Sequence, residues 1–289
     1  MTTSCPWVAP IAAGERPGEP GPRLLIQPVQ LLRLSGPDTL RFLHGQTSQD
    51  LALARPGAWL PTCCISPTAR MRALAEVLVE EQAALLVITA GDGAAVRQAF
   101  DRVLFPADAV ALGPLQEAMW LEAVVPEPSE APATAAAGAA VSGLTAESAG
   151  TSPADAPAAA EGDPAGDRRW QARPEGGWWL GPALVLPAGL EPPADLAALA
   201  ALDPWATEFR RLRLGLPAAP GELNDDTNPF ELGLADRVSL SKGCYVGQET
   251  LARLATYDGV RRQLRRWRAA AAGPDQRPPQ AGDPLRRAD

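Results

Sequence analysis

The chain has 289 residues and a formal net charge of −8, with a sequence pI of about 4.9. This length can hold two domains or one large domain with a sizeable core, and the acidic balance argues against a general grip on a nucleic-acid backbone, so no direct nucleic-acid partner is expected. No apolar run has the length of a membrane span and the N-terminus lacks signal-peptide regions, so we expect a cytoplasmic protein with no membrane partner.

The N-terminal region is expected to hold a flexible arm, two short strands and a helix. Residues 1–23 are rich in Pro, Gly and Ala and predict the arm. Residues 24–26 and 31–34 are typical of short strands. Asp38 can cap the helix that follows, and residues 45–50 then predict a polar loop.

A mixed succession of strands and one helix is expected next. The strands are predicted at residues 59–65, 73–79, 83–89, 107–112 and 119–125, and the helix at 92–104. This order lacks the regular alternation of a doubly wound sheet and is typical of an α+β fold. Residues 24–125 are therefore expected to form the first part of an α+β domain.

Residues 126–167 differ from the rest of the chain in composition. Ala, Pro, Gly, Ser and acidic residues dominate, and the only large apolar residues are Val141 and Leu144. Such a segment cannot bury enough apolar surface to offset its ordering entropy. We therefore expect a disordered insert.

Order is expected again in residues 168–260, the second part of the domain. The elements predicted here are strands at 178–180, 183–186 and 238–240 and helices at 205–214 and 250–255. A long loop precedes residue 236, and loops of that length in a compact domain are often functional.

Residues 242–249, with the sequence K-G-C-Y-V-G-Q-E, combine a thiol and an ammonium. A cation close to sulfur favours thiolate over thiol, so Lys242 could activate Cys244 as a nucleophile. Gly243 and Gly247 allow a sharp turn or a close approach to a ligand. The competing interpretation is a buried structural cysteine, and the motif alone leaves both open.

The other cysteines and the single histidine limit the chemistry further. Cys5, Cys63 and Cys64 form no C-x-x-C pair, so neither a zinc site nor a disulfide scaffold is expected. His44 is the only histidine, which excludes a multi-histidine metal site. A surface or loop position for His44 is favoured over a role as a base.

Several stretches together resemble the YgfZ group of folate-binding proteins, which are relatives of the aminomethyltransferase called the glycine-cleavage T-protein. The eight-residue motif, followed by Arg253 and G-V-R-R-Q-L at 259–264, carries most of the resemblance. The segment L-H-G-Q-T-S-Q-D at 43–50 is similar to the family's L-x-G-Q-x-T-x-D loop. Residues 212–217, then 221–223 and Pro229, are similar to its folate-side segment.

This resemblance implies an α+β fold with ferredoxin-like modules around a central folate channel and a small C-terminal β-barrel. The barrel would be incomplete here, with residues 261–269 as one strand and 281–285 as the start of the next. The implied cofactor is tetrahydrofolate, and the implied partners are iron–sulfur proteins or their assembly machinery. Members of the group support iron–sulfur enzymes, including one that modifies tRNA.

The resemblance also assigns the site residues. Cys244 is the critical thiol, with Lys242 beside it as the second catalytic residue. No metal ligands are expected. The residues expected on the folate side are Gln46, Asp50, Arg213, Tyr245, Gln248, Glu249 and Arg253.

Three departures from the family pattern bear on the chemistry. The T-protein's paired Asp-Asp corresponds to Ala75 and Glu76, which argues against true aminomethyl transfer. Arg213 replaces a glutamate expected to face folate, and a guanidinium offers only donors to a pterin. Ala69 takes the place of a turn glycine.

Three functions follow as hypotheses. The first is a folate-binding protein that supports iron–sulfur cluster assembly or repair through Cys244. The second is an aminomethyltransferase-type enzyme that moves a one-carbon unit to tetrahydrofolate, and the third is a non-catalytic interaction protein that has lost the pocket. Whether the protein is an enzyme stays open, with the first hypothesis leaning towards a non-enzymatic role.

Overall fold

The structure is a computed structural model that describes residues 21–125, 146–147, 168–257 and 259–267. Residues 1–20 of the expected arm and nearly all of the insert expected as disordered lie outside the described residues. The same holds for residues 268–289 of the expected barrel, including the strand predicted at 281–285.

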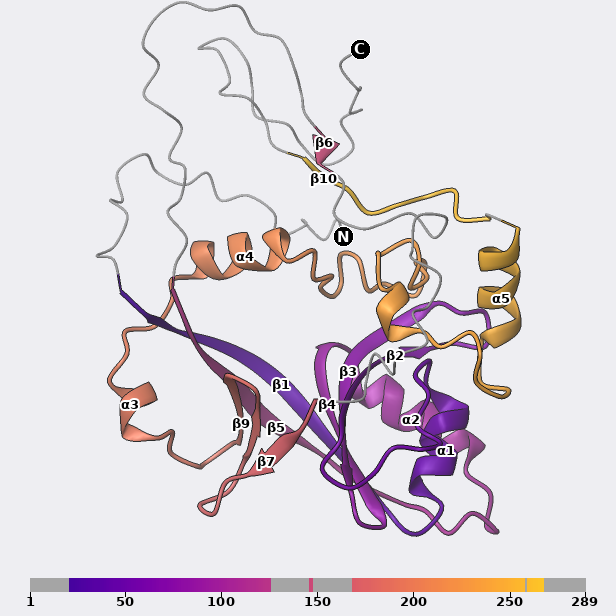
Figure 1. Cartoon of the computed structure of the whole chain (residues 1–289), viewed down its shortest axis with the longest axis horizontal. Coiled ribbons are helices and arrows are strands. Elements are labelled where there is room, and N and C mark those ends of the chain that lie inside the picture. The colour runs from indigo at the N-terminus through magenta and orange to yellow at the C-terminus, as the bar shows by residue number, and fades with distance from the viewer. Residues whose placement is uncertain (1–20, 126–145, 148–167, 258, 268–289) are drawn as a thin grey trace, which may run out of the picture.

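One eight-stranded antiparallel sheet organises the molecule and curls into an open half-barrel (Figure 1). The strand order is β2-β3-β4-β1-β5-β9-β8-β7. The strands are β1 (Arg23–Ser35), β2 (Trp59–Ile65), β3 (Met71–Glu80), β4 (Ala83–Gly91), β5 (Ala111–Val124), β7 (Trp170–Ala172), β8 (Trp178–Leu180) and β9 (Ala183–Pro187). The expected mixture of helices and strands is confirmed, whereas separate ferredoxin-like modules stay a prediction.

Two pairs of predicted short strands are each one long strand. The strands expected at 24–26 and 31–34 are both part of β1, because β4 pairs with β1 only from Gln30 onwards and leaves one side of the strand free at Pro28. The strands expected at 107–112 and 119–125 are replaced by β5 alone. A bulge in the register between β1 and β5 accommodates Gly113 and Pro114.

Two helices cover one face of the sheet. Helix α1 (Thr39–Gln46) and helix α2 (Gly93–Val103) meet through Phe42 and Phe100, whose rings make an edge-to-face contact with centroids 5.6 Å apart. Because side chains alternate along β3, Ala75 and Val77 face these helices while Glu76 points to the opposite face. That opposite face is lined by partly buried tryptophans, namely Trp59, Trp120, Trp170 and Trp178.

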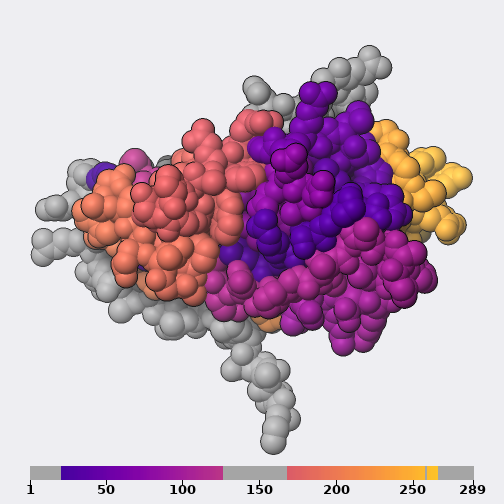
Figure 2. Space-filling model, turned by 90° about the horizontal axis from the view of Figure 1, so that it is seen from below, coloured from indigo at the N-terminus to yellow at the C-terminus, as the bar shows by residue number. Residues whose placement is uncertain are grey.

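The C-terminal half of the chain adds three strands to the same sheet and then continues into helices. Strand β9 pairs with β5, so residues 168–187 extend the sheet begun by the N-terminal half, and Figure 2 shows the two parts packed against each other. The remaining helices are α3 (Ala194–Ala197), α4 (Pro204–Arg213), the 3₁₀ turn η1 (Ala235–Arg237) and α5 (Gln248–Thr256). None of the helices in the described residues is long and apolar enough to cross a bilayer.

Three boundaries differ from expectation. Residues 238–240 are not a strand but an extended link after η1, held by a hydrogen bond from Ser239 N to the Ser48 carbonyl at 2.9 Å. Helix α1 extends into the expected loop as far as Gln46. Residues 261–265 form no strand; only Arg266–Trp267 (β10) does, paired with Ala146–Glu147 (β6).

Candidate functional site

The 242–249 motif forms a tight turn that is docked on the end of α1 and on the β2–β3 hairpin. Val246 N donates to the Gly45 carbonyl at 3.0 Å. Gly247 has a φ of 79°, and a Cβ built there would lie 2.9 Å from the Ser66 carbonyl oxygen. Only glycine fits this position without strain, which explains its place just before α5.

Lys242 is the buried anchor of this turn, with 5% of its surface exposed. Its ammonium donates to three backbone carbonyl oxygens, those of His44, Thr47 and Gln49, at 2.5, 2.7 and 2.7 Å. The ring of Tyr245 lies 4.3 Å from Nζ. Burial lowers the pKa of Lys242 to about 7, opposed by the charge of Asp50. The carbonyls and the ring favour the charged form, so the side chain acts as an ammonium that ties the motif to residues 44–49.

Tyr245 and Gln248 complete the inner side of the turn. Gln248 Nε2 donates to the Lys242 carbonyl at 3.1 Å. Tyr245 is 8% exposed, and its buried hydroxyl has no hydrogen-bond partner among the described residues. Burial raises the pKa of Tyr245 to about 12, so the phenol is neutral at physiological pH. A buried hydroxyl without a partner is costly, and a ligand could relieve that cost.

Cys244 lies exposed on this turn, between two anchored residues, Lys242 and Val246. The buried-cysteine interpretation of the motif is therefore wrong, because the fold points this side chain outwards. Cys63 and Cys64 are buried in β2, and burial raises the pKa of each thiol to about 12. Among the described cysteines, Cys244 alone is accessible for chemistry.

His44 and Asp50 lie beside the motif turn. Nδ1 of His44 accepts a hydrogen bond from Leu51 N at 3.2 Å and lies 3.3 Å from Oδ1 of Asp50. Burial, followed by the charge of Lys242, lowers the pKa of His44, and Asp50 acts in the opposite direction. The imidazole is therefore neutral near pH 7.

A buried ion pair between Glu76 and Arg237 lies on the tryptophan-lined face. Arg237 Nη1 donates to Oε1 of Glu76 at 2.9 Å, and Trp59 Nε1 donates to Oε2 at 2.6 Å. Glu76 is 5% exposed. The only acid at the positions of the T-protein's acid pair is therefore neutralised by this chain itself. Sequence reasoning missed Arg237, which ends η1, 161 residues away, and carries no local signal of this contact.

The other expected site residues are exposed or half-buried. Glu249 and Arg253 form an exposed ion pair along α5, one helical turn apart. Arg213 ends α4 and is exposed. Gln46 is half-buried at the end of α1, next to the turn, and Asp50 is exposed, with its Oδ1 accepting from Ala52 N at 3.0 Å.

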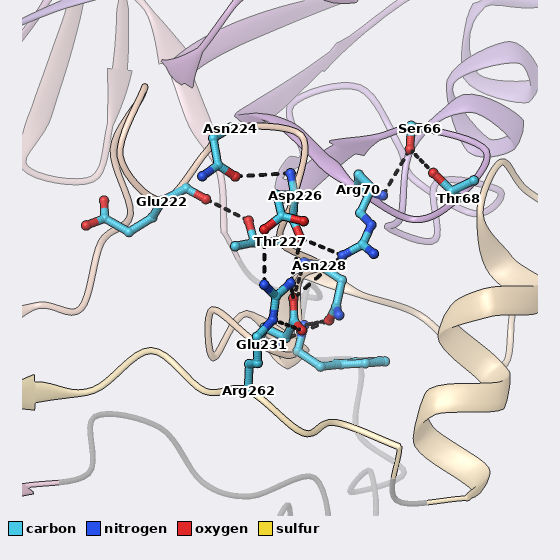
Figure 3. A network of polar contacts seen from close by, with 11 residues as sticks. Ser66, Thr68, Arg70, Glu222, Asn224, Asp226, Thr227, Asn228, Glu231 and Arg262 are labelled. Atoms are coloured by element: carbon cyan, nitrogen blue, oxygen red, sulfur yellow. Dashed lines mark hydrogen bonds and ion pairs between the residues drawn. The ribbon is translucent and has the colours of Figure 1, made fainter. Parts of the chain in front are cut away.

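Figure 3 shows a second polar network, centred on the buried carboxylate of Glu231. This carboxylate accepts from Arg262 Nε at 3.1 Å and from Asn228 N at 3.0 Å. Arg262 also donates to Oδ2 of Asp226 at 3.0 Å, and Arg70 donates to the Asp226 carbonyl at 2.5 Å. The network joins the β2–β3 turn, the 222–231 loop and the C-terminal segment.

Comparison with known proteins gives a sequence relative and a structural neighbour. No family model matches the chain. The chain is 28% identical over 250 residues to a chloroplastic protein of Arabidopsis thaliana that carries the name putative transferase; the match covers 81% of this chain and 52% of that protein. The chain thus spans about half the length of this relative.

The structural comparison identifies the fold. The crystal structure of the glycine cleavage system aminomethyltransferase T from Bartonella henselae matches with a TM-score of 0.53 and 16% sequence identity, over 81% of this chain and 63% of that one. The fold is therefore similar to that of a glycine-cleavage T-protein.

Proposed function

We propose that the protein binds tetrahydrofolate in the cytoplasm and presents Cys244 as a thiol that supports iron–sulfur cluster assembly or repair, including clusters of tRNA-modifying enzymes. Its partners are iron–sulfur proteins or their assembly machinery. The observation that carries the proposal is the exposed Cys244 on a turn that the buried Lys242 anchors. Such a thiol is accessible to a partner and yet fixed in position.

The residues near the turn fit a ligand with a polar edge. Tyr245 offers a buried hydroxyl without a partner among the described residues, and Gln46 and Asp50 offer amide and carboxylate groups at the end of α1. These three residues would hold the folate, with Arg213 supplying donors from α4. A reduced folate carries one-carbon units, and its bound form would also order the site around Cys244.

Glu76 argues for a thiol protein over an aminomethyltransferase. A carboxylate that acts as a base must be free to take up a proton in the reaction. Both oxygens of Glu76 are already occupied by Arg237 and Trp59. This arrangement supports a structural role for Glu76.

The second candidate is a one-carbon transferase that uses tetrahydrofolate. It is favoured by the two comparisons, since one relative is named as a transferase and the structural neighbour as an aminomethyltransferase. Glycine-cleavage assays with tetrahydrofolate discriminate between the two candidates. Turnover that survives Cys244→Ala would favour the transferase.

Calorimetric titration with tetrahydrofolate tests the folate part of the proposal. Wild-type protein should bind, and Cys244→Ala should bind equally because the sulfur lies outside the proposed contacts. Arg213→Glu tests the third hypothesis, a non-catalytic protein that has lost the pocket. If this variant binds tetrahydrofolate and wild type does not, Arg213 prevents binding in the natural chain. That result would refute folate binding by the natural chain.

The thiol part is tested in cells that lack the protein. Activity of an iron–sulfur enzyme that modifies tRNA should be restored by wild type and by Glu249→Gln, a change in the exposed α5 pair. Cys244→Ala should fail to restore it. Equal rescue by Cys244→Ala would show that the thiol has no part in this function.

A further inference from the structure

His44 lies directly against the turn that carries Cys244. Lys242 Nζ donates to the His44 carbonyl at 2.5 Å, and Val246 N donates to the Gly45 carbonyl at 3.0 Å. Both ends of the turn are therefore fixed to consecutive residues of α1. His44, whose side chain carries the imidazole, is one of these two residues.

The imidazole is turned towards the middle of the turn. A Cβ built on Gly243 would lie 4.0 Å from Nε2 of His44, and no other heavy atom of the described residues, chain neighbours aside, would come within 4 Å. Gly243 precedes Cys244, so their Cα atoms are about 3.8 Å apart. The imidazole therefore lies beside the residue that directly precedes Cys244.

The hydrogen bond at Nδ1 fixes which ring nitrogen carries the proton. Leu51 N donates to Nδ1 at 3.2 Å, so Nδ1 presents its lone pair and the proton lies on Nε2. Asp50 Oδ1, at 3.3 Å from Nδ1, favours the other tautomer. The backbone N–H prevails here because Leu51 is fully buried and would otherwise lose its acceptor, whereas Asp50 is exposed and already accepts from Ala52 N.

We infer that His44 is a positioning residue of the thiol site, a neutral imidazole whose Nε2–H donates a hydrogen bond to the sulfur anion of Cys244 when that side chain turns towards it. The inference deepens the proposed function by adding a residue to the same site. The ammonium of Lys242 donates to three backbone carbonyls, whereas Nε2 of His44 donates to no group among the described residues. Burial and Lys242 lower the pKa of His44 and keep the ring neutral, with one donor and one acceptor nitrogen.

The tautomer can be observed directly by two-bond ¹H–¹⁵N correlation spectra of the folded full-length protein. His44 is the only histidine, so the spectrum contains one imidazole. The expected pattern is that of a neutral ring protonated at Nε2 near pH 7.5. A ring protonated at Nδ1 would overturn the inference.

The effect on sulfur is measured by the rate of iodoacetamide alkylation of Cys244 at pH 8, followed by mass spectrometry of its peptide. His44→Ala should slow the reaction by about tenfold, as expected for loss of a charge-assisted hydrogen bond. His44→Gln keeps an N–H at a similar reach and should restore most of the rate. Equal rates in wild type and His44→Ala, or equal loss in both variants, would contradict the inference.

Gly243→Ala provides a variant that leaves His44 and its Leu51 contact in place. The added methyl fits at ordinary contact distance, 4.0 Å from Nε2, so the melting temperature should stay that of wild type. The methyl would occupy space beside Nε2, on the residue next to the cysteine, so alkylation should slow as in His44→Ala. An unchanged rate would again contradict the inference. None of these measurements uses folate or an iron–sulfur client, so their failure is distinct from failure of the proposed function.

Discussion

Nζ of Lys242 lies 2.5 Å from the carbonyl oxygen of His44 and thereby joins the cysteine motif to the end of α1. This contact bridges 198 residues of sequence and is reinforced by two more carbonyls of the same segment. Lys242 thus fixes the position of Cys244 through hydrogen bonds to the backbone of residues 44–49.

Lys242→Met should lower the free energy of unfolding by about 3 kcal/mol, because it leaves three carbonyls at a buried site without their donor. Lys242→Arg should cost less than Met but still destabilise, since a planar guanidinium cannot direct one nitrogen at three acceptors. Urea unfolding followed by tryptophan fluorescence measures both. Wild-type stability in Lys242→Met would show that the ammonium is not an anchor.

Arg237→Met should lower the free energy of unfolding by about 3 kcal/mol or more, because Glu76 would remain buried without its cation. The double change Arg237→Met with Glu76→Gln should recover most of the loss, since the amide oxygen can still accept from Trp59. The comparison of single and double variants in thermal and urea unfolding measures this coupling. Additive losses would mean that the pair does not interact.

Tyr245→Phe should stabilise the ligand-free protein by about 1 kcal/mol, because it removes a buried hydroxyl without a partner among the described residues. The same change should weaken tetrahydrofolate binding if that hydroxyl contacts the ligand. Differential scanning calorimetry and titration calorimetry measure the two effects. A clear loss of stability would show that the hydroxyl has a partner in the native protein.

Stability should fall as pH rises above about 9. Burial raises the pKa of Cys63 and Cys64 to about 12, whereas the thiols ionise near 9 when the chain unfolds. The folded state therefore holds protons that the unfolded state has lost, and each thiol reduces stability by about 1.4 kcal/mol per pH unit between 9 and 12. Below pH 9 both thiols stay protonated in the folded and the unfolded chain, so this loss of stability does not occur.

The control for the alkaline effect is the Cys63→Ala, Cys64→Ala double variant. It should be less stable at pH 7, because two buried side chains become smaller, but its stability should fall less steeply between pH 9 and 11. Urea midpoints at each pH provide the comparison. An unchanged slope would assign the alkaline effect to other groups, Tyr245 among them.

Arg262→Ala should increase cleavage of the 259–265 segment by added protease several-fold, because Arg262 ties this segment to the carboxylates of Glu231 and Asp226. Arg261→Ala is the matched control, since Arg261 is exposed and has no ion pair among the described residues. Limited proteolysis with peptide mapping measures the difference. Equal cleavage of the two variants would show that the Arg262 contacts do not restrain the segment.

Local pattern was sufficient to predict most elements and to single out the motif. Alternating and helical spacing predicted β2, β3, β4, α2 and α4 within a few residues, and the fold is of the mixed kind expected. The pattern failed at residues 24–34, where two short strands were expected and the single strand β1 runs through Pro28. Whether Pro28 breaks β1 depends on which neighbouring strand pairs at that point. The local sequence does not specify this pairing.

The sequence by itself determined that a cysteine, a lysine, two glycines and a glutamine stand together in one eight-residue turn, because neighbours in the chain must be neighbours in space. Only the tertiary structure decided that the sulfur is exposed, that the lysine is spent on carbonyls almost 200 residues earlier, and that Glu76 is neutralised by Arg237. Burial and ion pairing depend on which distant segments meet, and that is settled by packing of the whole sheet.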